Sequence, residues 1–309
     1  LFHRLRRNTK SGSKANIAAH YDLGNDFFER FLDPTMTYSS ACFAHPGMTL
    51  EQASIEKLDR LCRKLDLKPD DHLLEIGTGW GSMAIHAARH YGCRVTTTTI
   101  SRQQFELARE RVRRAGLEDR IEVLERDYRD LEGEYDKLVS VEMIEAVGHE
   151  FLGDYMHACS ARLKPDGVMA IQVITIQDQL YARAVREVDF IKRYIFPGSF
   201  IPSITAIGDA MAARTDLRMF HLEDMAPHYA ETLRRWRGNL HANREEILAL
   251  GSYDEAFLRL WDYYLCYCAG GFEERQLGVA QIVFTKPLCR MDPILPRLDG
   301  VDEPRLRRA

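Results

Sequence analysis

The stretch "LLEIGTGWGS", residues 73–82, decides the fold of this protein. Its apolar first half is typical of a buried strand, and Gly77, Gly79 and Gly81 stand where that strand turns into a helix expected over residues 80–92. In such a turn, backbone N–H groups and a helix N-terminus can approach a polar ligand closely. The stretch therefore predicts a ligand-binding turn, with tight packing of a strand on a helix as the structural alternative.

The spacing of these glycines separates two classes of cofactor. It is GxGxG rather than GxGxxG, and "TTTT" (96–99), about 20 residues further on, lacks the acid that a dinucleotide-binding site uses on the ribose. Glu75, just before the first glycine, resembles instead the first motif of S-adenosylmethionine-dependent methyltransferases. A nicotinamide oxidoreductase is therefore the least favoured function.

Strand and helix patterns alternate on both sides of the turn. Strands are expected at 71–77, 93–100, 120–127, 135–144 and 167–176, and the helix that begins near residue 150 is expected to end at Pro165 and Gly167. This alternation predicts a parallel, doubly wound α/β sheet. Two further helices, at about 228–248 and 253–269, precede a last strand at 277–286.

The chain divides into five expected parts. Residues 177–215 are too long for an ordinary connection and are interpreted as an insertion. The parts are an N-terminal helical lid (1–65), a cofactor-binding core (66–176), a cap (177–215), the C-terminal part of the core (216–290) and a tail (291–309).

Composition excludes several classes of protein. With 309 residues, 45% hydrophobic and 28% charged, the chain is ordinary globular material, and its net charge of −4 gives no general attraction to nucleic acid. Seven cysteines without metal-ligand spacing predict reduced thiols in a cytosolic protein and no metal site. No apolar run approaches the ~18 residues that span a bilayer. Because the chain begins without methionine, we expect it to be a piece of a longer protein.

Seven sequence blocks occur in one order along most of the chain. They are "AHYDLGNDFFERFLDPTMTYSSACF" (19–43), "GTGWG" (77–81), "TISRQQ" (99–104), "EMIEAVGHE" (142–150), "YIFPGSFIPS" (194–203), "PHYAETLRRW" (227–236) and "QIVFTK" (281–286). Together they resemble the cyclopropane-fatty-acyl-phospholipid synthase family, which includes the mycolic acid cyclopropane synthases. The resemblance implies the class I methyltransferase fold, a Rossmann-like seven-stranded doubly wound sheet. It also implies transfer of a methyl group from S-adenosylmethionine to a cis double bond of a phospholipid acyl chain, followed by proton loss and ring closure.

The resemblance also implies which residues bind S-adenosylmethionine. They are Tyr38, Ser39, Glu75, Gly77, Gly79, Trp80, Gly81, Thr99, Ile100, Gln104 and Tyr128. Two of these have structural alternatives. Gln104 forms an S-x-x-Q capping box with Ser101, and Tyr128 can be buried simply because it follows a strand.

The implied catalytic residues centre on Glu145, an acid just after the fourth expected strand. In the family this glutamate and a tyrosine at the position of Tyr229 hold a bicarbonate ion, the proton acceptor. Ser40, Gln172 and Ile174 complete that set, and Tyr21 begins a segment that closes over the acyl cavity. A helix N-terminal charge and a core tyrosine are the alternatives for Glu145 and Tyr229, and docking on the core is preferred for the aromatic residues Phe27, Phe28 and Phe31.

Two departures from the family pattern bear on the product. The family reads "YSCAY" where this chain reads "YSSAC", which places Ser40 at the cysteine position, and "LHTI" becomes "IQVI", which places Gln172 at the histidine position. A hydroxyl and an amide can still donate to an anion. If the proton is lost elsewhere, the product is a methylene- or methyl-branched chain rather than a ring.

Residues 186–202 mix basic side chains, among them Lys192 and Arg193, with aromatic ones. Such a segment suits either a helix in a lipid head-group layer or an amphipathic cap on the sheet. We therefore expect a cytoplasmic enzyme that associates transiently with the inner face of the membrane and acts on an unsaturated phospholipid acyl chain, with a homodimer as a candidate assembly and no nucleic acid partner. A small-molecule methyltransferase and a lipid-binding module without turnover are the alternatives.

Overall fold

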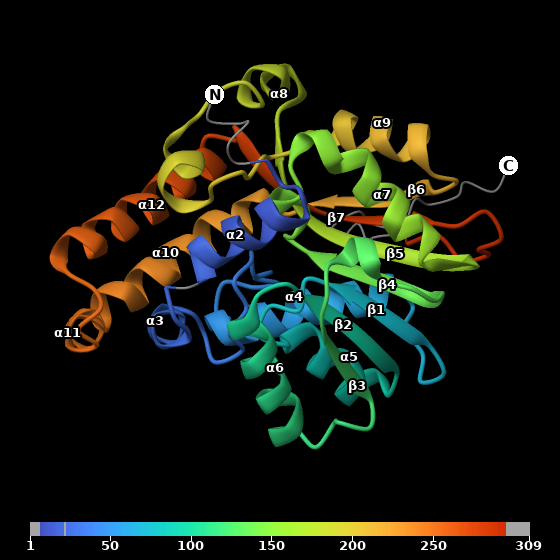
Figure 1. Ribbon diagram of the computed structural model, residues 1–309, viewed down its shortest axis with the longest axis horizontal. Coiled ribbons are helices and arrows are strands. Elements are labelled where there is room, and N and C mark those ends of the chain that lie inside the picture. The colour runs from blue at the N-terminus through green and yellow to red at the C-terminus, as the bar shows by residue number, and fades with distance from the viewer. Residues whose placement is uncertain (1–6, 22, 295–309) are drawn as a thin grey trace, which may run out of the picture.

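The computed structural model describes residues 7–21 and 23–294, and its centre is one twisted sheet (Figure 1). Within these residues, seven strands lie in the order β3-β2-β1-β4-β5-β7-β6. Their bounds are β1 His72–Ile76, β2 Arg94–Thr99, β3 Ile121–Glu125, β4 Tyr135–Val141, β5 Leu163–Ile176, β6 Arg218–Asp224 and β7 Leu277–Thr285.

The five strands of the alternating pattern are parallel, as predicted, but the sheet as a whole is mixed. Strands β3, β2, β1, β4 and β5 run parallel, whereas β7 lies antiparallel between β5 and β6. Leu277, the first residue of β7, pairs with Ile176, the last residue of β5. The chain therefore enters β7 at the carboxyl edge of the parallel strands and has to run back across the sheet.

One predicted boundary is wrong, and one strand was not predicted. Helix α7 (Leu152–Ala161) ends earlier than expected, and Pro165 and Gly167 belong to β5 instead. A residue before proline disfavours helical backbone, and the Tyr135 N–H bonds to the Arg162 carbonyl at 2.8 Å, which starts the strand pairing there. Strand β6 was not expected, because an edge strand that carries charged residues gives a weak apolar signal.

Helices cover both faces of the sheet. On one face, α4 (Leu50–Lys64), α5 (Ser82–Tyr91) and α6 (Arg102–Arg114) pack on a core that includes Leu73; on the other, α7 and α9 (Ile204–Arg214) pack on a core that includes Leu74. Successive residues of a strand point to opposite faces, so the buried pair Leu73 and Leu74 shows that β1 is covered on both sides.

A third, aromatic core lies beyond the carboxyl edge of the sheet. It joins α3 (Asn25–Phe31) to α10 (Ala226–Ala242), α11 (Arg244–Ala249) and α12 (Glu255–Glu273), which extend to the left in Figure 1. The aromatic residues of α3, Phe27, Phe28 and Phe31, are fully buried, as their core interpretation predicts. Phe27 meets the ring of Trp261 edge-on at 5.0 Å. This core fixes α3, and with it the chain that leads to Tyr38, against the C-terminal helices.

Three further helical segments surround the carboxyl edge. Helix α2 (Lys10–Tyr21) lies near the middle of the molecule in Figure 1, and α8 (Asp178–Ala184) and the π-helical turn η4 (Ile191–Ile195) follow β5. Asn8 Nδ2, just before α2, donates to the Gly198 carbonyl at 2.8 Å, so the N-terminal segment contacts the loop after η4.

Candidate functional site

The glycine turn forms the floor of a cavity of about 160 Å³ at the carboxyl edge of β1. Gly77, Gly79 and Gly81 have φ values of 99°, 52° and 89°, a region that glycine adopts without strain. A Cβ at Gly77 would lie 3.0 Å from Met143 Cγ, one at Gly81 would lie 3.4 Å from the Ala108 Cβ, and one at Gly79 would meet no atom within 4 Å. Gly77 and Gly81 thus allow close packing of neighbouring residues, whereas Gly79 leaves open space beside the cavity.

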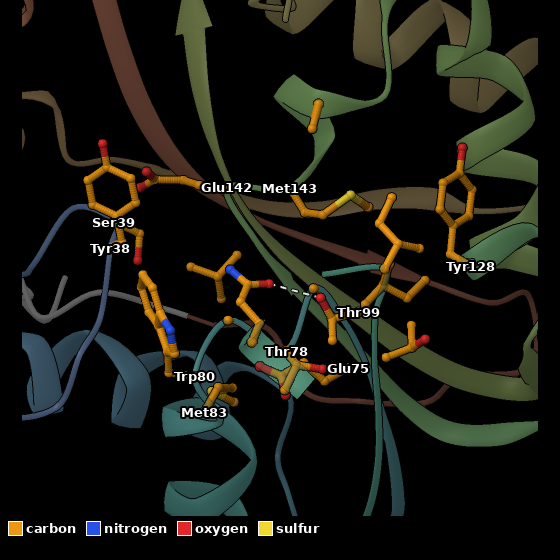
Figure 2. A pocket seen from close by; sticks show the side chains of 18 of the residues that line it. Tyr38, Ser39, Glu75, Thr78, Trp80, Met83, Thr99, Tyr128, Glu142 and Met143 are labelled. Carbon is orange, nitrogen blue, oxygen red and sulfur yellow. Dashed lines mark hydrogen bonds between the residues drawn. The ribbon is translucent and has the colours of Figure 1, made fainter. Parts of the chain in front are cut away.

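The cavity gathers nearly the whole set of residues predicted to bind the cofactor. Gly81 lies outside the lining, and the residues that line it are Tyr38, Ser39, Glu75, Gly77, Gly79, Trp80, Thr99, Ile100, Gln104 and Tyr128. Figure 2 places Tyr38 and Trp80 at one end of the pocket and Tyr128 at the other. Strands β1 and β2, the turn after β3 and the segment before α4 all contribute, so the cavity depends on the sheet as a whole.

Hydrogen bonds hold several of these side chains in place. Thr99 Oγ1 donates to Gln104 Oε1 at 2.8 Å, and the Ser101 hydroxyl caps α6 by accepting from the Gln104 N–H. The Gln104 side chain therefore bonds to Thr99, and its backbone N–H is the group that the Ser101 hydroxyl caps. Trp80 Nε1 donates to Asn25 Oδ1 at 2.8 Å, which ties the glycine turn to α3.

Two aromatic residues stand at the ends of the cavity. The Tyr38 hydroxyl lies 2.9 Å from the Tyr264 hydroxyl, and its ring stacks on Phe196 with centroids 6.4 Å apart. Tyr128 begins the short helix η1 (Tyr128–Asp130) and meets Tyr155 edge-on at 5.4 Å. Burial raises the pKa of the Tyr128 phenol, so this group stays neutral.

A buried lysine, which the sequence reading missed, lies beside the cavity. Lys57 of α4 has no exposed surface, and its Nζ donates to Ser39 Oγ at 2.5 Å. Burial lowers the pKa of Lys57 to about 8, and the charges of Glu142, Asp33 and Glu75 oppose that shift. Its place on the apolar stripe of α4, between Ser54 and Leu58, was the signal available in the sequence.

Glu75 sits at the end of β1 and is almost fully buried. Thr97 Oγ1 donates to its Oε2 at 2.6 Å. Burial raises the pKa of Glu75 to about 8, against the effects of the Thr97 hydrogen bond and the charge of Lys57. The carboxyl is thus held toward β2 and balanced by a buried cation.

Two glutamates follow β4, and the sequence reading named only the second. Glu142 directly follows the strand, and its carboxylate accepts three hydrogen bonds: from the Ser40 N–H at 2.9 Å, Gln172 Nε2 at 2.8 Å and the Tyr229 hydroxyl at 2.7 Å. The expected strand 135–144 ends at Val141, because Glu142 has a φ of 48° and turns the chain. Tyr229 therefore bonds to Glu142 and not to Glu145.

Glu145 lies in the short helix η2 (Ile144–Ala146), and its two carboxylate oxygens differ. Oε1 accepts from the Ile174 N–H at 2.6 Å, whereas Oε2 is buried without a hydrogen-bond partner among the described residues. Burial raises the pKa of Glu145 to about 8, and the charge of Glu142 adds to the shift. The protonated form is favoured near neutral pH.

A second cavity, of about 940 Å³, opens on the other side of these acids. It lies within the usual range for ligand pockets, and its walls are largely aliphatic and aromatic. Among the predicted catalytic residues, Glu145, Ile174 and Tyr229 line it, while Ser40 and Gln172 are buried behind Glu142. Tyr38 and Glu142 line both cavities, so they stand at the junction between the two.

The predicted lid residue Tyr21 ends α2, and its side chain lies outside the described part of the structure. Earlier residues of the same segment border the cavities: Ile17 lines both, and Asn8 and Asn16 line the larger one. Helix α2, which lies within the expected lid of residues 1–65, thus borders both cavities just before Tyr21.

Residues 186–202 include both buried and exposed side chains. Lys192 is buried, and its Nζ donates to the backbone carbonyls of Ala184 and Glu187, so this side chain fits the cap alternative and not the head-group one. Tyr194 is 57% exposed, and next to it Tyr263 and Tyr267 of α12 are 54% and 43% exposed. Phe190 packs between the two elements, with its ring 4.8 Å from Tyr263. These tyrosines form an exposed aromatic patch beside the larger cavity, which Tyr267 also lines.

The sheet order and the glycine turn define a class I S-adenosylmethionine-dependent methyltransferase fold. The mycolic acid cyclopropane synthase CmaA1, in a structure complexed with SAH and CTAB, superposes with a TM-score of 0.82 at 33% identity, over 88% of this chain and 98% of that one. The family model described as mycolic acid cyclopropane synthetase matches residues 8–282. The chain belongs to this family, and the resemblance inferred from the seven blocks is confirmed.

Two relatives by sequence carry different names. The tuberculostearic acid methyltransferase UfaA1 of Mycobacterium tuberculosis is 42% identical over 280 residues, which cover 88% of this chain and 65% of that protein. The cyclopropane-fatty-acyl-phospholipid synthase of Escherichia coli is 36% identical over 282 residues, which cover 90% of this chain and 70% of that protein. The chain thus spans about two thirds of the length of these relatives.

Proposed function

We propose that this protein transfers a methyl carbon from S-adenosylmethionine to the cis double bond of an unsaturated fatty acyl chain in a membrane phospholipid, and that proton loss then closes a cyclopropane ring. The observation that carries the proposal is the pair of cavities, one lined by the glycine turn and one largely apolar, that meet at Tyr38 and Glu142.

The smaller cavity suits S-adenosylmethionine. The open approach at Gly79, the carboxyl of Glu75 and the aromatic residues at either end offer backbone, polar and stacking contacts to a nucleoside joined to an amino acid. The bound molecule would supply an electrophilic methyl carbon. In this proposal Tyr38 stands where the two substrates meet, because it lines both cavities.

An alkene substrate explains the apolar character of the larger cavity. A double bond has no lone pair and no acidic proton, so a base cannot activate it as it activates a hydroxyl or an amine. The protein must instead hold the reacting carbons in line and exclude water, which would trap the carbocation as an alcohol. The rings of Tyr38, Phe196 and Tyr264, which contact one another, offer faces that stabilise positive charge.

A second product is favoured by a specific comparison. The relative at 42% identity is named a methyltransferase, and the one at 36% is named a cyclopropane synthase. The differences at Ser40 and Gln172 fall behind Glu142, to whose carboxylate both residues donate a hydrogen bond. If a hydride shift precedes proton loss, the same methyl transfer gives a methylene-branched chain, which a separate nicotinamide- or flavin-dependent reductase of the cell would have to reduce to give a methyl branch.

Peripheral association with the cytoplasmic face of a membrane is part of the proposal. No helix within residues 7–21 and 23–294 is long and apolar enough to cross a bilayer. The exposed aromatic patch of Tyr194, Tyr263 and Tyr267 supports contact with a lipid interface, since tyrosine is enriched where apolar and aqueous regions meet. An acyl chain could then enter the cavity beside the patch without leaving the membrane completely.

The test is an analysis of lipid products. Cells that express the protein are extracted and their fatty acids analysed by mass spectrometry and NMR, while the purified protein is assayed for release of S-adenosylhomocysteine with vesicles of unsaturated phospholipid. A ring methylene signal supports cyclopropane formation, and exocyclic methylene or branched methyl signals support the second product. Release of S-adenosylhomocysteine that is equal with saturated and unsaturated vesicles would contradict both.

A further inference from the structure

Glu142 occupies the position at which an anion would be held. Its carboxylate takes the Tyr229 hydroxyl, the Gln172 amide and the Ser40 N–H, which are the donor groups that the resemblance implied for a bicarbonate ion. The Gln172 amide is also tied from behind, since its Nε2 donates to the Ser40 carbonyl at 3.0 Å and its Oε1 accepts from Gln281 at 3.0 Å. The donors are therefore already oriented and already used.

The backbone conformation of Glu142 is energetically unfavourable, which supports a functional role for this residue. A non-glycine residue with a φ of 48° costs of order 1–3 kcal/mol, and such residues gather at functional sites. The Glu142 N–H bonds to the Gln172 carbonyl at 2.7 Å, which holds the turn. Figure 2 shows the Glu142 side chain pointing away from that of its neighbour Met143, which lines the cofactor-side cavity.

A separate bicarbonate does not fit these residues. The three donors are taken by Glu142, and Glu145 presents a second carboxyl with an unpartnered oxygen at the same cavity. A bicarbonate ion would be a third anionic group beside two carboxyls and would not reduce the repulsion between them. The donors of Ser40, Gln172 and Tyr229 would not be free to bind it. The buried Lys57, which donates to the Ser39 hydroxyl, lowers the pKa of Glu142 through its charge and so partly opposes the rise caused by burial.

We propose that Glu142 is the built-in proton acceptor of the reaction and replaces a diffusible anion. This inference rests on the proposed function. After the new methyl carbon has bonded to one alkene carbon, a C–H bond of that methyl breaks. Its electron pair forms the second C–C bond to the neighbouring cationic carbon, and the proton moves to the Glu142 carboxylate. The product is a neutral cyclopropane, and the proton passes to solvent before the next turnover.

Glu142 is better suited to this role than Glu145. Burial raises the pKa of both acids, but the charge of Lys57 and three direct hydrogen bonds oppose the rise at Glu142, whereas Glu145 has one backbone donor and the neighbouring negative charge of Glu142. Of the pair, Glu142 is thus the one expected to carry the negative charge, with Glu145 protonated. Glu142 also borders both cavities, and Glu145 borders the larger one.

The experiment measures S-adenosylhomocysteine release by the purified full-length protein with vesicles of dioleoyl phosphatidylglycerol and dioleoyl phosphatidylethanolamine. Buffers are freed of carbon dioxide, and bicarbonate is then added back at millimolar concentration. The wild-type rate should be the same in both buffers. Glu142→Gln keeps the shape of the side chain and should lower turnover by about 10²–10⁴-fold, the usual contribution of a general base. Glu134→Gln, an exposed acid before β4, is the matched control and should leave turnover unchanged.

A second variant guards against a failure to fold. Glu142→Gly suits the positive φ and opens space among the donors, so it should fold, bind S-adenosylmethionine in calorimetry and lack turnover until bicarbonate is added. The inference is overturned by a wild-type rate that depends on bicarbonate, by wild-type turnover in Glu142→Gln, or by a Glu142→Gly variant that bicarbonate does not revive. Failure of the proposed function looks different: the wild-type protein itself would form no product from the unsaturated vesicles in either buffer.

Discussion

The two cavities of this protein are built in opposite ways. The smaller one begins with a local turn, in which Gly77, Gly79 and Gly81 lie within five consecutive residues. The acid cluster at the larger one brings together Ser40, Glu142, Gln172 and Tyr229, which come from four separate segments of the chain. A cofactor site made by local backbone geometry can therefore be recognised as a motif in the sequence. A proton-transfer site assembled by packing distant segments cannot.

The largest effect on cofactor affinity is expected at the local site. Gly77→Ala places a Cβ 3.0 Å from Met143 at a φ of 99°, which alanine rarely adopts. Strain of about 2–3 kcal/mol at the turn should weaken S-adenosylmethionine binding roughly 30- to 100-fold in calorimetry. Gly116→Ala is the control, because Gly116 also has a positive φ but meets no atom within 4 Å and lies away from the cavity. Equal affinity losses in both variants would mean that the turn has no special role.

A mutation in the acid cluster should lower turnover without weakening the binding of the cofactor. Tyr229→Phe removes the hydroxyl that donates to Glu142 and leaves a buried carboxylate oxygen without that donor. The loss of about 1–3 kcal/mol should lower turnover roughly 10- to 100-fold, with unchanged binding of S-adenosylmethionine. Tyr135→Phe, which removes a hydroxyl bonded to the Glu132 carbonyl far from the acids, should change neither quantity. A large loss of S-adenosylmethionine affinity in Tyr229→Phe would show that the two sites are not separable.

The acid cluster should also leave a signature in the pH dependence of stability. Burial raises the pKa of Glu145 from 4.5 to about 8, so the folded protein holds a proton that the unfolded chain releases. The stabilisation is complete below pH 4.5 and is lost as the pH rises toward 8. Glu145→Gln cannot ionise, so at pH 9 it should be more stable than wild type by roughly 2–4 kcal/mol in urea unfolding, with little difference at pH 4.5. A stability gap that is the same at both pH values would contradict this ionisation.

The smallest effect is expected at the surface beside the larger cavity. Replacing Tyr194 and Tyr263 by serine removes two exposed rings and should weaken binding to anionic phospholipid vesicles a few-fold in a flotation assay. Leu288→Ser, an equally exposed apolar residue after β7, is the control. Vesicle binding that falls as much in the control as in the double variant would remove the patch from the proposal.

Features that depend on interactions between residues close in sequence were predicted correctly, whereas features that depend on distant residues were missed. The strand, the turn and the helix over residues 71–92 were predicted correctly, because their signals are the apolar run, the glycines and the helical period themselves. Strand β6 was missed, since its residues are only partly buried at a sheet edge. The reversed direction of β7 was missed as well, because it depends on where α12 delivers the chain.

Glu142 shows the same limit at the level of one residue. In sequence it lies within the expected strand 135–144, and only its φ of 48° in the structure directs the carboxylate to Tyr229 and Gln172. Lys57 had a readable signal, a cation on an apolar helix stripe, but its partners lie on other elements. For the residues inferred from the resemblance, the structure shows where each described side chain lies, and their roles stay predictions.

The sequence by itself determined the class of fold, the glycine turn and the family, because each of these rests on short-range patterns or on blocks preserved in order along the chain. Only the tertiary structure decided which acid receives the donors, which helix covers the cavities and which aromatic side chains stay exposed. The physical reason is that hydrogen bonds, burial and charge compensation depend on distances between atoms, and residues such as Ser40 and Gln172, which are 132 positions apart, meet only after the sheet has formed.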